Sequence, residues 1–277
     1  MKRVRRTDMS WHTDMFMRDG IFSDLDAIFN IHKYTSFPTP HNLTNIVREQ
    51  NTHFRSLNCQ FINQNENFDW EGQYYEEIIY TKSLIPTREE NWHDFFNAMI
   101  WGLFPNTKKL LNKLHAEDIE AFGQKQRTKQ RDAITLFDEC GIVLAYESEQ
   151  DKIALQQHLW LDSFWRHRDR WFNQIRPFIF GHALYEMSLS PFIGLTAKAY
   201  FIKVSDKFWN FSLDKKYQIL DALLVKQISE QQSLQDNSNL SPLPLLGVPD
   251  WYPDNNQQHF YENTDYFRPK RKSTKAA

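Results

Sequence analysis

The feature that most constrains the fold is a short helix-breaking segment, "GLFPN" at residues 102–106, between two amphipathic patterns. The first pattern places large apolar residues on one broad helical face, namely Trp92, Phe95, Phe96, Met99 and Ile100. The second forms an apolar stripe of Leu110, Leu111, Leu114, Ile119 and Phe122. Gly102 and Pro105 end the first helix, and so short a connection favours an antiparallel helical pair.

Capping signals mark the ends of these helices. "TREE" at 87–90 has the capping-box form, in which Thr87 accepts from the first turn and Glu90 reaches back. Asn106 is the expected cap of the second helix, which should end at Gly123. A third helix is expected over residues 124–139.

The rest of the chain predicts a predominantly helical α+β fold. "IVLAY" and "AYFIKV" are short and β-branched, which indicates strands in a small sheet of two or three. "FIFGHALYEM" after Pro177 and "SLDKKYQILDALLVKQI", capped by Ser212, are expected helices. The segment "QFINQNENFDWEGQ" is expected to be a loop. We expect a single domain over 1–277, with flexible basic termini at 1–6 and 270–277 and a polar loop at 229–241.

The C-terminal segment 242–268 contains too many prolines for a helix or a central strand. It is nevertheless rich in aromatic and aliphatic residues. We therefore expect an extended strap that docks Leu245, Leu246 and Trp251 on the main body.

Composition excludes several classes of protein. Of 277 residues, 41% are hydrophobic, which is ample for a folded core. The net charge of −2 gives no overall attraction to nucleic acid, so such a role could come only through the basic termini. No apolar run approaches the ~20 residues of a membrane span. The two cysteines, Cys59 and Cys140, make no disulfide framework, and we expect a soluble, cytoplasmic protein.

Four blocks of the sequence resemble a bacterial family known as domain of unknown function 3025. They are "IPTREENWHDFFNAMIWGLFPNTKKLLNKLH", "RDAITLFDECGIV", "FGHALYE" and "PLPLLGVPDWYPDNNQQHFYENTDYFRP". The blocks keep the family's order and span roughly residues 70–270. The resemblance implies one domain in a cytoplasmic bacterial protein, and it implies no reaction.

The first candidate site lies at the start of the helix 91–101. His93 projects beside Ile100, at the edge of the apolar face, with Asn97 one turn on and Asp94 further round. Asp94 suits the helix dipole as a first-turn carboxylate, so these groups could also be the cap and rim of a core helix. We predict that His93 faces inward and hydrogen bonds another polar side chain, because a polar ring near a core must be satisfied. The expected partners are His115, Arg131, Asp132, Asp138, His182 and Glu186.

Further histidines suggest a metal site. His115 falls within the apolar stripe of the second helix, and an antiparallel pair would bring it near His93. His182 and Glu186 form an i,i+4 pair, which can bind a metal together or form a structural hydrogen bond. His93, His115, His182 and Glu186 are therefore candidate ligands for a divalent metal such as zinc, manganese or iron.

The third helix carries a different polar stripe. Arg127 and Arg131 stand one turn apart and could bind a phosphate or carboxylate, or could pair with neighbouring acids on a solvated face. Asp138 lies further along the stripe and joins His93, Asp94 and Asn97 as a candidate catalytic residue. Glycine-rich phosphate loops, nucleophile elbows and HExxH motifs are absent from the sequence.

These residues support three functions. The first is a binding or scaffold protein with an internal polar network. The second is a metal-dependent enzyme, such as a hydrolase, with a His/Asp/Glu site. The third is an anion-binding module built on Arg127 and Arg131. Convergence of the histidines and acids in one cleft would favour the enzyme.

Overall fold

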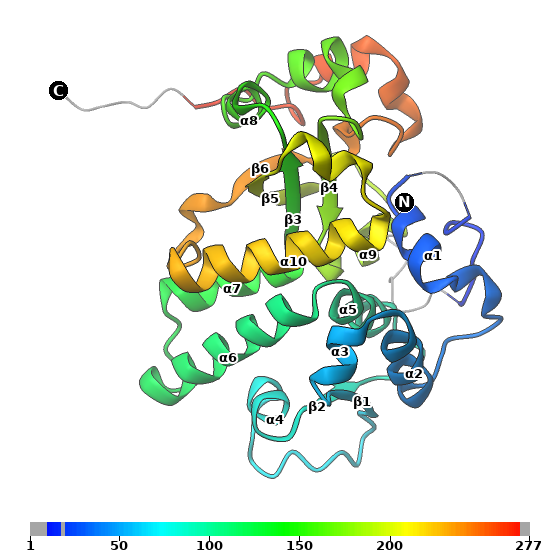
Figure 1. Ribbon diagram of the computed structural model, residues 1–277, viewed down its shortest axis with the longest axis vertical. Coiled ribbons are helices and arrows are strands. Elements are labelled where there is room, and N and C mark those ends of the chain that lie inside the picture. Colours follow the sequence, from blue (N-terminus) through cyan, green and yellow to red (C-terminus); the bar gives the residue numbers. More distant parts are fainter. Residues whose placement is uncertain (1–9, 18–19, 272–277) are drawn as a thin grey trace.

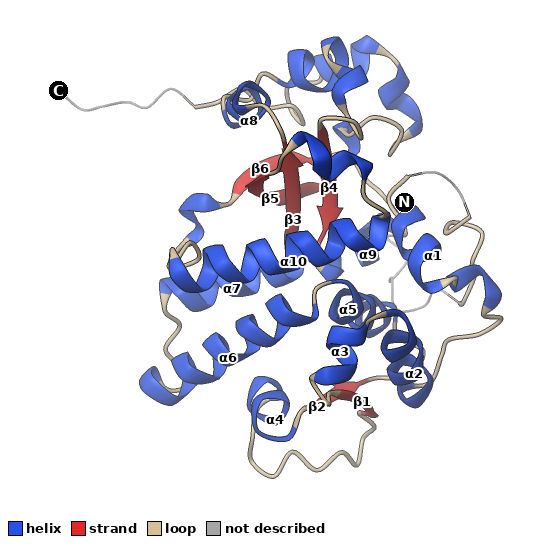
Figure 2. Cartoon of the chain, in the orientation of Figure 1, coloured by secondary structure: helices blue, strands red, loops and turns tan. Residues whose placement is uncertain are grey.

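The structure, a computed structural model, describes residues 10–17 and 20–271 of the chain. The expected flexible segment 1–6 and residues 272–277 lie outside the described residues. Helices predominate and surround a small sheet (Figure 1, Figure 2). The α-helices are α1 (Ser23–Phe29), α2 (Pro40–Gln50), α3 (Thr52–Ser56), α4 (Tyr75–Lys82), α5 (Trp92–Leu103), α6 (Pro105–Phe122), α7 (Lys129–Cys140), α8 (Glu149–Gln156), α9 (His182–Ser188) and α10 (Leu213–Glu230).

The main sheet has four strands in the order β4-β3-β5-β6, one more than the largest number expected. Its strands are β3 (Gly141–Tyr146), β4 (Ile175–Ile179), β5 (Thr196–Lys203) and β6 (Ser241–Pro244). The central strand β3 runs parallel to β5 and antiparallel to β4. All six residues of β3 are buried, as a strand covered on both faces requires.

Strand β4 corrects the sequence prediction of one helix through "FIFGHALYEM". The first two residues of this segment, Phe178 and Ile179, are the end of β4, and helix α9 begins only at His182. Pro177 lies within β4, which is an edge strand with β3 as its one neighbour in the sheet. An edge position tolerates proline because the missing N–H need not serve a second neighbouring strand.

A second, two-stranded parallel sheet joins β1 (Gln60–Asn63) to β2 (Leu84–Thr87). The expectation that residues 60–63 form a loop was therefore wrong. Thr87 ends β2 and does not cap α5, because its hydroxyl donates to the carbonyl of Ile85. Asn91 caps α5 instead, and its side-chain oxygen accepts from the backbone N–H of Asp94 at 3.1 Å.

Helix α5 forms the centre of the core, and its whole predicted apolar face is buried. It packs on α9 and α2, while α6 lies against α4 and α10 (Figure 1). The expected antiparallel pairing of α5 with α6 was wrong, because only Phe104 separates the two helices. Helical hairpins need a loop of about 2–5 residues for the chain to reverse.

The beginning of α6 and the burial of its last turn differ from the prediction, although the helix ends at Gly123 as expected. The helix starts at Pro105, and Asn106 is not its cap, because its backbone N–H and amide both donate to Asp221 of α10. Leu111 and Ile119 are buried, while Leu110 and Leu114 are half-buried. Phe122 is 54% exposed, so the apolar stripe ends one turn before the helix does.

The C-terminal segment packs as the expected strap. Its first residues form the edge strand β6, Leu245 and Leu246 are fully buried, and Trp251 is half-buried. The hydroxyl of Tyr266 donates to the carbonyl of Leu195 at 2.6 Å and accepts from the backbone N–H of Leu246 at 2.9 Å. The strap thereby completes both the sheet and the core.

Candidate metal centre

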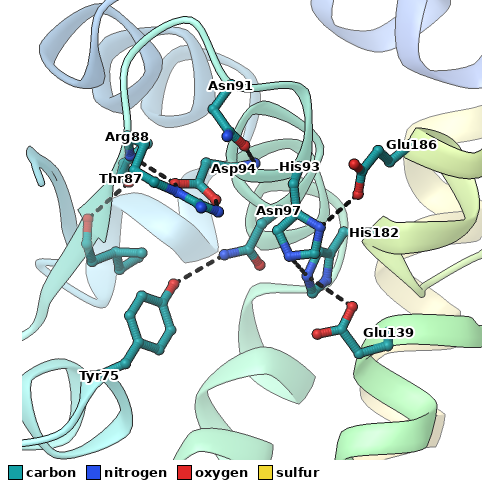
Figure 3. Close-up of polar contacts among 11 residues, drawn as sticks. Tyr75, Thr87, Arg88, Asn91, His93, Asp94, Asn97, Glu139, His182 and Glu186 are labelled. Atoms are coloured by element: carbon teal, nitrogen blue, oxygen red, sulfur yellow. Dashed lines mark hydrogen bonds and ion pairs between the residues drawn. The ribbon is translucent and has the colours of Figure 1, made fainter. Parts of the chain in front are cut away.

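Three helices place the polar residues of the candidate centre. His93 comes from the first turn of α5, and His182 and Glu186 come from α9 (Figure 3). Asp138 and Glu139 come from the last turn of α7, just before the central strand β3. Residues far apart in the sequence therefore meet where α7 ends and α9 begins.

Gly181, which precedes α9, allows the start of this helix to lie close to the end of α7. A Cβ atom on Gly181 would lie 2.4 Å from the carbonyl oxygen of Glu139 and 2.5 Å from the backbone nitrogen of Gly141. Both contacts are to backbone atoms and cannot be relieved by rotating a side chain. Gly181 therefore lets the chain cross the end of α7 closely, and this crossing sets His182 beside Glu139.

The two imidazole rings face each other through their Nε2 atoms. These atoms lie 2.9 Å apart, and the ring planes are inclined at 78°. Oε2 of Glu139 lies 3.5 Å from Nε2 of His182. One ligand atom from each of His93, Glu139 and His182 lies within 4.8 Å of the others, which is close enough to bind one ion together.

The opposite nitrogen of each imidazole faces a carboxylate. Nδ1 of His93 donates to Oε2 of Glu186 at 2.8 Å. Nδ1 of His182 lies 4.0 Å from Oδ2 of Asp138, whose other oxygen accepts from Nζ of Lys108 at 2.5 Å. The hydrogen bond from His93 to Glu186 holds the proton on Nδ1 and leaves the Nε2 lone pair of His93 free for a metal, whereas Asp138 is too far from His182 to form such a bond.

Burial and charge separate the two histidines. Burial lowers the pKa of His182 to about 3, although the negative charge of Asp138 opposes this change. Burial also acts to lower the pKa of His93, but the hydrogen bond to Glu186 and the charge of Glu139 raise it above its usual value. His182 is thus neutral at pH 7, the form in which a histidine binds a metal.

The centre opens on a cavity of about 340 Å³. Its lining residues are Gln64, Trp70, Tyr75, Glu76, Pro86, Arg88, His93, Asp94, Asn97, Asp138, Glu139 and His182. Asp94 accepts from Nε and Nη2 of Arg88 at 2.9 and 2.7 Å, so this pair forms one wall. The amide nitrogen of Asn97 donates to the hydroxyl of Tyr75 at 3.0 Å.

The donor set fits a divalent transition metal. Two imidazole nitrogens and one carboxylate suit Zn²⁺, and the same set with open positions suits Fe²⁺. Metal sites in enzymes keep a coordination position free for water or substrate. Here all three ligand residues line the cavity, so space for such a molecule adjoins them.

The structure confirms the prediction that His93 faces inward and hydrogen bonds a polar side chain. Its partners, Glu186 and His182, were both among those expected. Asn97 turns instead to Tyr75, and Asp94 bonds Arg88. The candidate catalytic residue Asp138 lies behind His182, where it lines the cavity and pairs with Lys108.

His115 was expected near His93 but lies in a different place. It is buried on α6 and lines a separate small space of about 20 Å³, together with Lys108 and Asp138. The reason is the direction of α6, which does not fold back along α5. His115 does not belong to the metal-binding group of His93, Glu139 and His182.

The two arginines proposed for anion binding are already engaged. Arg127 donates to Asp132 at 2.6 Å and to Thr135 at 2.9 Å. Arg131 donates to the backbone carbonyl of Gln124 at 3.2 Å. Because α7 begins at Lys129, Arg127 precedes the helix and the two residues do not form one helical stripe.

Glu139 is the candidate ligand that the sequence analysis missed. It follows Asp138 in the last turn of α7. Two negative charges at this end of a helix are unfavourable, because the C-terminal end of the helix dipole is also negative. Acids in so unfavourable a place need a nearby cation, and here Lys108 serves Asp138. That placement was the one available signal, and it could not name the histidines that Glu139 meets.

The fold and the site define a helical α+β protein with a cavity lined by histidines and acids. The chain belongs to the family described as "Protein of unknown function (DUF3025)", whose model matches residues 59–271. No curated protein and no solved structure matches the chain. In the part of the chain that the structure describes, no helix is long and apolar enough to cross a bilayer.

Proposed function

We propose that this protein is a metal-dependent enzyme, a hydrolase, whose metal is held by His93, His182 and Glu139. The observation that carries the proposal is the approach of the two Nε2 atoms to 2.9 Å beside a carboxylate at the wall of a cavity. A bound Zn²⁺ lowers the pKa of a water molecule to about 7, which supplies a nucleophile at neutral pH.

The protein's own residues have distinct roles in this proposal. Glu186 orients His93, and Asp138, fixed by Lys108, stands behind His182. Arg88 is half exposed at the cavity wall and is held by Asp94 at two of its nitrogens. These contacts would hold the ligand side chains in position before substrate binds. Such outer contacts commonly set the orientation of the ligands and the affinity of a site for its metal.

A binding or scaffold protein remains the alternative, since an internal polar network of the same residues could serve structure alone. Two observations favour the enzyme. His93, His182 and Glu139 line one cavity instead of scattering through the core. Among the described residues Glu139 is also within ion-pair distance of His182 alone, which is neutral at pH 7, so a bound cation would balance the charge of Glu139.

Metal analysis of protein purified without an affinity tag tests the proposal. We expect close to one equivalent of zinc or iron per chain by mass spectrometry, and metal uptake by the stripped protein. His182→Gln and Glu139→Gln should remove most of this metal, while Glu117→Gln, a change at an exposed acid on α6, should retain it. Correctly folded protein that takes up no zinc, manganese or iron would overturn the proposal.

A further inference from the structure

The protein side chains that line the cavity beside the metal centre include more acids than bases. Its described lining contains four acids, Glu76, Asp94, Asp138 and Glu139, and one arginine, Arg88. Arg88 is neutralised by its two contacts to Asp94, and Asp138 is neutralised by Lys108. With Glu139 assigned to the metal, the carboxylate of Glu76 remains without a cationic partner among the described residues.

Glu76 is held in a fixed position. Nδ2 of Asn112, a buried residue of α6, donates to Oε2 of Glu76 at 2.6 Å and to its backbone carbonyl at 2.9 Å. Oε1 has no hydrogen-bond partner in the described part of the chain. A carboxylate that is oriented in advance loses less conformational freedom when it binds a ligand.

Aromatic side chains line the same cavity as this carboxylate. Tyr75 precedes Glu76 on α4, and Trp70 lines the same cavity. Burial raises the pKa of the Tyr75 hydroxyl well above its usual value, and the negative charges of Glu76, Asp94 and Asp138 raise it further. A carboxylate and aromatic faces in one cavity attract ammonium groups, whereas the unpaired carboxylate of Glu76 repels phosphates and carboxylates that come close to it.

We infer that the substrate is a small carbonyl compound that carries a positively charged amine, with Glu76 as the residue that binds the amine. The inference rests on the proposed metal centre, which would bind the carbonyl end of the molecule. The cavity of about 340 Å³ is at the small end of the range of ligand sites. Glu76 would thus determine specificity without taking part in the bond cleavage.

Three hydroxamates with the same metal-binding group and different charges test the inference. They are β-alanine hydroxamate, which carries an ammonium group, propanohydroxamate, which is uncharged beyond the hydroxamate, and succinic monohydroxamate, which carries a carboxylate. Isothermal titration of the zinc-loaded full chain measures the affinity of each. We expect β-alanine hydroxamate to bind about tenfold more tightly than propanohydroxamate, as a charged hydrogen bond warrants, and the succinic compound to bind most weakly.

Variants separate the two parts of the argument. Glu76→Gln keeps an acceptor for Asn112 and should abolish the preference for the ammonium compound, with propanohydroxamate binding unchanged. Glu117→Gln should keep the preference. Equal binding of all three compounds, tighter binding of the succinic compound, or a preference that survives Glu76→Gln would overturn the inference and leave the metal centre standing. If the protein takes up no zinc and none of the three hydroxamates binds, the proposed function is overturned and the inference with it.

Discussion

The Nε2 atoms of His93 and His182 lie 2.9 Å apart, although 89 positions separate the residues in the chain. Without a metal, one of the two nitrogens must carry a proton and donate it to the other. With a metal, both lone pairs can point to the ion. A measurement of the metal content therefore distinguishes the two roles of this histidine pair, a structural hydrogen bond or a set of metal ligands.

Glu186 should tune the affinity for the metal without being a ligand. Its carboxylate accepts from Nδ1 of His93, so its removal leaves the ring less firmly oriented and less basic. We expect Glu186→Ala to weaken metal binding by about 10–100-fold. Glu186→Gln should weaken it less, because the amide oxygen can still accept. Competition with a chromogenic chelator measures both, and equal affinities of Glu186→Ala and the parent protein would contradict this role.

Gly181 should be intolerant of any side chain. An alanine Cβ would lie within 2.6 Å of three backbone atoms at the junction of α7 and β3, so the start of α9 must move. We expect Gly181→Ala to cost about 1–3 kcal/mol of unfolding free energy, as overpacking does, and also to weaken metal binding. Urea unfolding and metal titration measure the two effects. A variant with unchanged stability and affinity would show that the close crossing is not required.

His182 should make the metal-free protein sensitive to acid. Its folded pKa of about 3 lies below the unfolded value of about 6.5, so the unfolded state binds more protons between these values. Stability is therefore lost as the pH falls from about 6.5 towards 3, by at most about 1.4 kcal/mol per pH unit for this one group.

Urea titrations in the presence of a chelator at pH 7 and pH 5 test this dependence. We expect His182→Gln to lose less stability than the parent protein over this range. The difference between the two proteins therefore reports His182 together with its charge effect on the neighbouring His93 and Asp138. His53→Gln, a change at an exposed histidine of α3, serves as the control and should behave like the parent. Parallel losses in all three proteins would contradict the expectation.

Tyr266 should anchor the C-terminal strap through its hydroxyl. Tyr266→Phe leaves the backbone N–H of Leu246 without a partner in a buried place, while the carbonyl of Leu195 still accepts from the backbone N–H of Leu245. We expect a loss of about 1–3 kcal/mol, the usual effect of an unsatisfied buried group. Tyr252→Phe, a change at a half-buried tyrosine of the same strap, is the matched control. Thermal unfolding should separate the two variants, and equal melting temperatures would sink the prediction.

Local patterns in the sequence predicted the elements whose signals are local. The face of α5, strands β3 and β5, the Ser212 cap of α10 and the docking of Leu245 and Leu246 are all confirmed. Each follows from apolar periodicity, β-branched composition or a capping side chain, which act over a few residues. The inward position of His93 followed from the same helical projection.

Only the tertiary structure decided which polar residues meet. Because Phe104 alone links α5 to α6, α6 does not fold back along α5. His115 therefore lies apart from His93 and lines a separate space. The close crossing at Gly181 brings His182 to Glu139. The sequence did not reveal this crossing, because the end of β4 was read as part of a helix. Amphipathic periodicity determines which face of a helix is buried, but the direction of one helix relative to another depends on loop length and on close contacts between distant backbones. The sequence by itself therefore determined the buried face of α5 and the inward histidine, and the packing of α5, α7 and α9 determined the site.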